Sequence, residues 1–232
     1  MYSRRFNSAS GVIFMSNWAN EIEADLNWRE GELAAIKIQI LTTDRVKHPV
    51  RYEALLRAIT TLLYAHYEGF CRFAWDLYLD TIQRQNIKRN QCREEVIKLS
   101  LRKRFKELGG DLSADGVWSF FSNELPALIN ENIEFNIRLE ADSNLKPMLL
   151  KKNSTDAGLS CSMVDQHELL LKTLVSRRNN IAHGQKEIIH DLTEYNKYEN
   201  AALEAMYELG LSVIDCLDNR KYLKPSNPPS SS

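Results

Sequence analysis

Apolar residues recur at three- and four-residue steps along most of the chain, which is the spacing of helices rather than of strands. The first such segment runs from Asn17 to Leu41. A second, strongly apolar segment opens after His48 and extends to Gln85, with Pro49 in the first turn, where a missing N–H costs nothing. Its aromatic side chains have the spacing of a packing face. The pattern predicts an all-α protein that starts with two long helices.

The middle of the chain predicts shorter elements. Residues 91–107 form a basic amphipathic pattern that is broken by Gly109-Gly110, and Ser113 is expected to cap a short, aromatic-rich helix. Residues 132–139 alternate as in a strand or an extended segment. A further helix is expected at 144–153, followed by the polar loop NSTDAGLS.

Two later helix starts carry a stronger signal. Asp165 and Asp191 each precede a glutamate by three residues, which is the arrangement of a capping box. The helix expected from Gln166 ends in the sequence RRNNIAHG. The apolar residues that we expect it to bury are Leu169, Leu170, Leu174 and Val175.

The length of 232 residues fits one substantial core. We expect a flexible extension at 1–15, a single helical domain at 16–223 and a disordered tail at 224–232, where proline and serine dominate. The composition is 44% hydrophobic and 26% charged, with a net charge of -1, so global charge points to neither nucleic acid nor membrane as a partner.

The sequence also limits compartment and cofactors. Apolar runs are far shorter than the roughly 20 residues that cross a bilayer, and the N-terminal stretch does not resemble a signal peptide. Four cysteines, Cys71, Cys92, Cys161 and Cys216, lie far apart and have no metal-ligand or disulfide spacing. We therefore expect a reduced, cytoplasmic protein that requires no metal or other cofactor.

Candidate chemistry is concentrated in the segment 177–184, at the end of an apolar helix. If the helix persists, Asn179 and His183 share one face at positions i and i+4, and the long side chain of Arg178 reaches the same area. A guanidinium binds phosphate through two oxygens, and an imidazole moves protons near neutral pH. Such a pair suits cleavage of RNA without a metal, with the ribose 2′-OH as nucleophile.

The same residues also have a purely structural explanation. Basic side chains near a helix C-terminus are favoured by the helix dipole, and glycine is an ordinary helix stop. Spacing alone leaves both explanations open.

RNNIAH at 178–183 resembles the motif of the HEPN superfamily, an arginine and a polar residue followed after a short spacer by a histidine. The segments LLYAHYEGFCRFAWDLYLDTI at 62–82 and SNLKPML at 143–149 are similar to a bacterial branch of HEPN proteins from mobile, conflict-related gene neighbourhoods. The resemblance implies a HEPN-type helical bundle, a homodimer that brings two motifs into one cleft, and metal-independent endoribonuclease activity on RNA.

By position, the resemblance implies that Arg178 binds phosphate, that Asn179 orients the site and that His183 is the general acid or base. Some HEPN toxins carry a tyrosine two positions after the histidine, which a partner nucleotidyltransferase modifies. Here that position is Gln185, so restraint by an antitoxin of that type is in doubt.

Supporting residues are expected in two places. Glu68, on an apolar helix, needs a partner, for which Arg178 is the candidate, while His66 on the same helix is expected to be a satisfied bundle histidine. Arg102, Lys103 and Arg104, together with Arg177, are candidates for RNA contact, although nearby glutamates also allow a solvated charged face.

Three functions remain open from the sequence. The first is a ribonuclease effector, either a toxin or an anti-phage, abortive-infection component. The second is a non-catalytic HEPN scaffold that dimerises or binds a nucleotide or a partner protein. The third is an immunity or sensor subunit of a larger defence complex.

Overall fold

The computed structural model describes residues 17–110, 113–136 and 144–225. Within these ranges every regular element is helical. The expected extension at 1–15 and most of the expected tail at 224–232 lie outside them. The elements in chain order are α1 Asn17–Thr42, α2 Pro49–Arg84, the 3₁₀ turn η1 Arg89–Gln91, α3 Glu94–Ser100, α4 Arg102–Gly110, α5 Ala114–Ser119, the π-helical turn η2 Phe120–Glu124, α6 Leu125–Asn130, α7 Pro147–Asp156, α8 Ser162–Gln166, α9 Glu168–Ala182 and α10 Leu192–Asp218.

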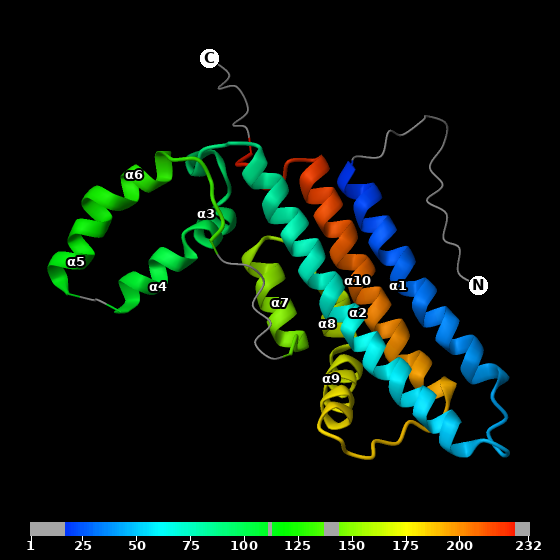
Figure 1. Cartoon of the computed structure of the whole chain (residues 1–232). Coiled ribbons are helices and arrows are strands. Elements are labelled where there is room, and N and C mark those ends of the chain that lie inside the picture. The colour runs from blue at the N-terminus through cyan, green and yellow to red at the C-terminus, as the bar shows by residue number, and fades with distance from the viewer. Residues whose placement is uncertain (1–16, 111–112, 137–143, 226–232) are drawn as a thin grey trace, which may run out of the picture.

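Three long helices, α1, α2 and α10, lie side by side and form the body of the molecule (Figure 1). α2 is central, because it packs against α1, α10 and α9. Its aromatic side chains face this core as expected: Tyr67, Phe70 and Trp75 are almost completely buried. The short helices α4 to α6 extend away from the body on the side opposite α1, and α9 lies near the end of the bundle where α2 begins.

A buried arginine crosses the contact between α1 and α2. Arg29 Nε lies 2.6 Å from Asp25 Oδ2, and Nη1 lies 3.4 Å from His66 Nδ1. His66 Nε2 lies 3.2 Å from Glu32 Oε2. It is nevertheless buried without a hydrogen-bond partner among the described residues, so the expectation of a satisfied bundle histidine is not met at this nitrogen. A Cβ on Gly69 would lie only 2.8 Å from Arg29 Nη1. The AHYEGF segment therefore accommodates the arginine, with a histidine that contacts it and a glycine that leaves room for it.

In the middle of the chain, the structure divides one predicted helix and decides between the two alternatives expected for the segment that starts at residue 132. The helix expected at 91–107 is divided, because Leu99, Ser100 and Leu101 are all buried and one helical face cannot bury three consecutive residues; the chain turns at Leu101. Residues 132–136 are extended, as the alternation indicated, with Ile133 and Phe135 buried. They form only an isolated bridge, Lys88 to Asn132, so of the two expected alternatives the described part shows the extended segment and not a strand; residues 137–139 lie outside that part.

The predictions for the later helices had mixed outcomes. α7 starts at Pro147, not at residue 144, and it continues through residues that were expected to form a loop. The Asp165 cap is wrong: α9 begins at Glu168 after His167, and the Asp165 carboxylate lies 2.6 Å from Lys151 Nζ.

The cap at Asp191 is confirmed, because its Oδ1 accepts a 2.9 Å hydrogen bond from the Glu194 N–H. The Glu194 carboxylate accepts from the His190 N–H rather than from that of Asp191, so the reciprocal half of the predicted capping box differs. On α9, Leu169 is exposed, whereas Leu171 is buried with Leu174 and Val175.

Candidate active site at the end of α9

The candidate site lies at the C-terminal end of α9. His183 follows the last helical residue, Ala182, and its side chain is exposed. Gly184 has φ +76°, and two hydrogen bonds close the helix: Gly184 N–H to Ile181 O and Gln185 N–H to Asn180 O. This is a Schellman ending, which favours glycine because a side chain is strained at positive φ. The chain therefore turns away directly after His183 and leaves its imidazole at the surface.

Arg178 is held by neutral groups from three parts of the chain. Its Nη1 donates to Asn144 Oδ1 at 2.7 Å and to Asn179 Oδ1 at 3.0 Å. The guanidinium carbon lies 4.7 Å from the centroid of the Tyr64 ring. Among the residues that the structure describes, no carboxylate forms an ion pair with Arg178. The half-buried guanidinium is thus positioned without being neutralised by any described carboxylate.

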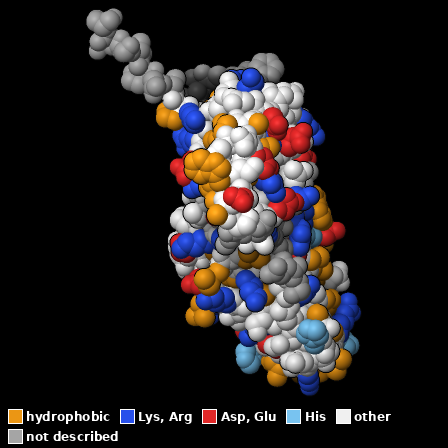
Figure 2. Space-filling view, turned by 90° about the vertical axis from the view of Figure 1, so that its left-hand side faces the viewer, with side chains coloured by type: hydrophobic (Ala, Val, Ile, Leu, Met, Phe, Trp, Pro, Cys, Tyr) orange, Lys and Arg blue, Asp and Glu red, His pale blue; other side chains and the backbone are white. Residues whose placement is uncertain are grey.

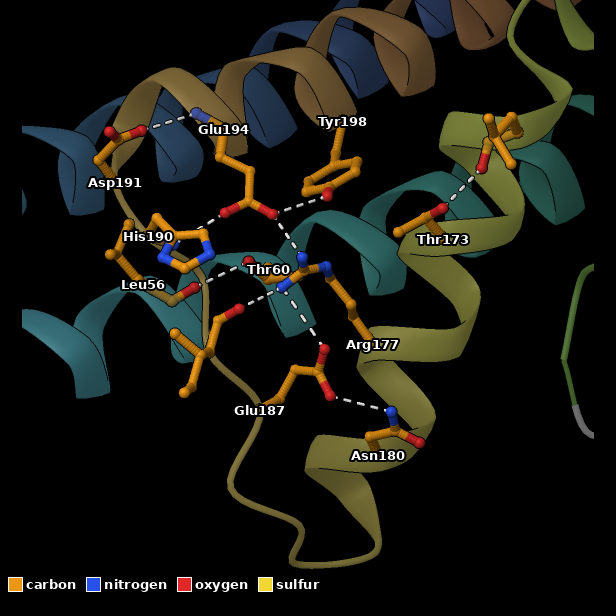
Figure 3. Close-up of polar contacts among 12 residues, drawn as sticks. Leu56, Thr60, Thr173, Arg177, Asn180, Glu187, His190, Asp191, Glu194 and Tyr198 are labelled. Atoms are coloured by element: carbon orange, nitrogen blue, oxygen red, sulfur yellow. Dashed lines mark hydrogen bonds and ion pairs between the residues drawn. The ribbon is translucent and has the colours of Figure 1, made fainter.

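Arg177, the preceding residue, has the opposite surroundings (Figure 3). Its guanidinium forms an ion pair with Glu194, lies 3.5 Å from Glu187 Oε1 and donates to the Ile188 carbonyl. It also lies over the ring of Tyr198. These contacts fasten the connection between α9 and α10 to both helices. Because Arg177 is neutralised inside the chain, the geometry argues against the RNA contact expected of it.

The carboxylate of Glu194 is the centre of this network. Burial by itself would raise the pKa of Glu194, but hydrogen bonds from the His190 N–H and the Tyr198 hydroxyl, together with the charge of Arg177, lower it. The distances from these donors to the carboxylate are 2.8 Å for His190 N and 2.9 Å for Tyr198 Oη. Glu194 is therefore held in its charged form opposite Arg177.

Glu68 does not pair with Arg178, which corrects the expected partnership. Its Oε1 accepts hydrogen bonds from Arg72, four residues along α2, at 2.7 Å and 3.1 Å. Glu68 instead acts on Tyr64: burial of the Tyr64 hydroxyl and, next, the Glu68 carboxylate raise the pKa of Tyr64. Tyr64 therefore stays protonated.

The structure does not bring the other expected basic residues to this site. Arg102, Lys103 and Arg104 lie on α4, apart from α9 (Figure 1). Arg104 forms ion pairs with Glu124 and Glu107, and Arg102 Nη1 lies 4.0 Å from Asp156 Oδ2. Figure 2 shows the side of the molecule on which α4 to α6 lie, and basic and acidic side chains are interspersed there. RNA contact by Arg102, Lys103 and Arg104 remains a prediction, and of these three residues only Lys103 is exposed.

Sequence reasoning missed Tyr64 and Asn144 as neighbours of Arg178. The spacing of aromatic residues in the second long helix predicts a packing role for Tyr64, and the helix predicted at 144–153 includes Asn144. The available signal was that these residues belong to the two segments, 62–82 and 143–149, that share the HEPN resemblance with RNNIAH. In the structure, the three segments meet at Arg178.

Residues 18–222 match a protein-family model described as HEPN_MAE_28990-like HEPN. The chain belongs to the HEPN superfamily. HEPN domains are generally associated with RNases, although some are non-catalytic, and they commonly dimerise. No curated protein and no solved structure matched this HEPN chain.

Two further features of the HEPN chain concern metals and membranes. In the described ranges, no three or more His, Cys, Asp or Glu side chains are grouped so that they could hold a metal ion. Among the described helices, none combines the length and the apolar character needed to span a bilayer.

Proposed function

We propose that this HEPN domain is a metal-independent endoribonuclease that uses Arg178 and His183, with Asn179 orienting the arginine. The observation that carries the proposal is the contrast between two adjacent arginines. Arg177 is neutralised by Glu187 and Glu194, whereas Arg178 is held by amide oxygens and an aromatic ring, five residues before the exposed His183 in the sequence. A cation kept unneutralised at a half-exposed position suits the binding of an anion.

The proposed reaction follows from these two side chains. The ribose 2′-oxygen attacks the adjacent phosphorus, the bond to the 5′-oxygen breaks, and a 2′,3′-cyclic phosphate forms. His183 transfers a proton, either by removing it from the 2′-OH or by delivering it to the leaving 5′-oxygen. Arg178 stabilises the negative charge that grows on the phosphoryl oxygens. General acid–base help contributes roughly 10² to 10⁴ in rate, so the pair supports a modest nuclease.

A homodimer completes the proposal. One motif supplies one imidazole, and the reaction needs both a proton acceptor and a proton donor. A second copy would supply the second imidazole if the two helix ends face one cleft. The exposed position of His183 at the end of α9 leaves it accessible to a partner protomer.

The biological role that we propose is a cytoplasmic toxin or anti-phage, abortive-infection effector. It would be restrained by an antitoxin or by a partner in a defence complex. Induced expression of the wild type, but not of His183→Ala, should arrest bacterial growth and fragment cellular RNA. Equal growth with both proteins at matched levels would contradict the toxin role.

Cleavage of a mixed RNA pool in EDTA tests the enzyme activity directly. Wild type should cut and leave 2′,3′-cyclic phosphate ends, whereas His183→Ala and Arg178→Ala should not. His190→Ala is the matched control, because it removes another exposed imidazole from the connection that follows His183. Cleavage by all four proteins would indicate a contaminant. If none of them cuts although all are folded, the non-catalytic scaffold becomes the better explanation.

A further inference from the structure

Arg178 is the meeting point of three segments that are distant in sequence. Asn179 adjoins it on α9, Tyr64 reaches it from the central helix α2, and Asn144 reaches it from the connection before α7. Asn144 is free to do so because α7 begins only at Pro147. A chain that only needed to end a helix would not require contacts from three segments.

Tyr64 makes two different contacts at this point. Its ring face carries the guanidinium, and its hydroxyl accepts a 2.8 Å hydrogen bond from the Leu145 N–H. Leu145 is completely buried, so the backbone next to Asn144 is fixed to α2. One buried side chain thus places both the arginine and the asparagine that binds the arginine.

The hydrogen bonds use only one end of the guanidinium. Nη1 carries two protons, and the oxygens of Asn144 and Asn179 accept them. Within the described part of the chain, the edge formed by Nε and Nη2 has no hydrogen-bond partner. This edge has the two parallel donors that bind phosphate through two oxygens.

We infer that Tyr64 and Asn144 are positioning residues that fix Arg178 Nη1 and present the Nε–Nη2 edge to the phosphate that is cleaved. The inference rests on the proposed ribonuclease function and specifies how its arginine is oriented. Neutral acceptors suit this task, since a carboxylate in the place of the Asn144 amide would hold the guanidinium equally well but neutralise it. Arg177 illustrates that outcome.

Substitutions at Asn144 separate positioning from structural support. Asn144→Ala should lower kcat roughly 10- to 100-fold with little change in KM, because a small misplacement of a charged group reduces the rate by this order. Asn144→Asp keeps an acceptor but adds a counter-charge, so it should lose a similar factor while the protein stays as stable as wild type. Tyr64→Phe keeps the ring and loses the hydroxyl that anchors Leu145 and interacts with Glu68, so its loss should be smaller. Asn130→Ala, an exposed asparagine on α6, is the control.

An NMR measurement of the Arg178 guanidinium tests the geometry without relying on catalysis. With ¹⁵N-labelled arginine, assigned by its loss in Arg178→Lys, the Nη groups of wild type should rotate slowly, and Asn144→Ala should speed that rotation. If wild type does not cleave RNA but this change occurs, the proposed function fails and the positioning role stands. Unchanged rotation in Asn144→Ala, or cleavage by Asn144→Ala and Asn144→Asp within about threefold of wild type, overturns the inference.

Discussion

Arg177→Ala and Arg178→Ala remove the same side chain from neighbouring positions of α9, so the change in intrinsic helix propensity is nearly equal. Any difference between the two variants therefore reports the contacts that each arginine makes. We expect opposite outcomes. Arg177→Ala should destabilise the fold with little direct effect on chemistry, whereas Arg178→Ala should remove cleavage and leave the fold nearly intact.

The magnitudes follow from the surroundings of each guanidinium. Loss of Arg177 leaves the carboxylates of Glu194 and Glu187 without their counter-charge, at side-chain exposures of 19% and 21%. Breaking a buried ion pair costs about 3–5 kcal/mol, and partial access of water reduces this to roughly 2–4 kcal/mol. Arg178 loses a half-exposed contact with the Tyr64 ring and hydrogen bonds to neutral amides, which together contribute about 1 kcal/mol.

Thermal unfolding followed by circular dichroism measures both effects. For a domain of this size, 1 kcal/mol shifts Tm by about 2–4 °C, so Arg177→Ala should unfold roughly 4–16 °C below wild type. RNA cleavage is then measured below the Tm of both variants. Equal Tm losses in the two variants would refute the assignment of separate roles. So would the absence of cleavage by fully folded Arg177→Ala, because it would place that arginine in the chemistry.

Other regions give independent predictions. Gly69→Ala should be about 1–3 kcal/mol less stable than Gly31→Ala in urea unfolding, since only the Gly69 Cβ meets Arg29 while both replace a helical glycine. Burial and the charge of Arg29 lower the pKa of His66, while the charges of Glu32 and Asp25 partly offset this shift. The imidazole of His66 is therefore protonated more readily in the unfolded chain than in the folded protein. Stability should therefore fall as pH decreases through about 6.5, more steeply in wild type than in His66→Gln. Asp191→Ala should cost about 1 kcal/mol in unfolding free energy, and an unchanged value would contradict its role as a cap.

Periodicity predicted the parts of the fold that one helix determines by itself. α1, α2 and α10 each bury a continuous stripe, and the side chain of Asp191 caps its own helix, so these features depend on residues close in sequence. The division at Leu101 depends on which surfaces pack against the 91–107 segment. Asp165 has the spacing of a cap, but Lys151 competes for its carboxylate from another helix. The helix division at Leu101 and the loss of the Asp165 cap are set by contacts between distant segments, which periodicity does not reveal.

In the candidate site, too, the local features could be predicted from the sequence and the long-range contacts could not. The motif placed Arg178, Asn179 and His183 together because they lie within six residues of one helix end. It could not separate the roles of Arg177 and Arg178, since consecutive helical residues point about 100° apart and their partners come from other segments. Tyr64 had the pattern of core packing, and it is indeed buried; its contact with the guanidinium depends on how α2 crosses α9.

The ion pairs around Tyr64 and α9 explain why no described carboxylate forms an ion pair with Arg178. Glu68 lies one turn further along α2 and raises the pKa of Tyr64, so its carboxylate lies near the tyrosine that Arg178 contacts. Arg72 binds that carboxylate on the same helix, and the Tyr64 ring lies under Arg178. These three glutamates thus have other cations as partners: Arg72 for Glu68, and Arg177 for Glu187 and Glu194. The arrangement leaves the Arg178 charge for an incoming anion, which is what a phosphate-binding arginine requires and what a helix that merely ends in basic residues does not.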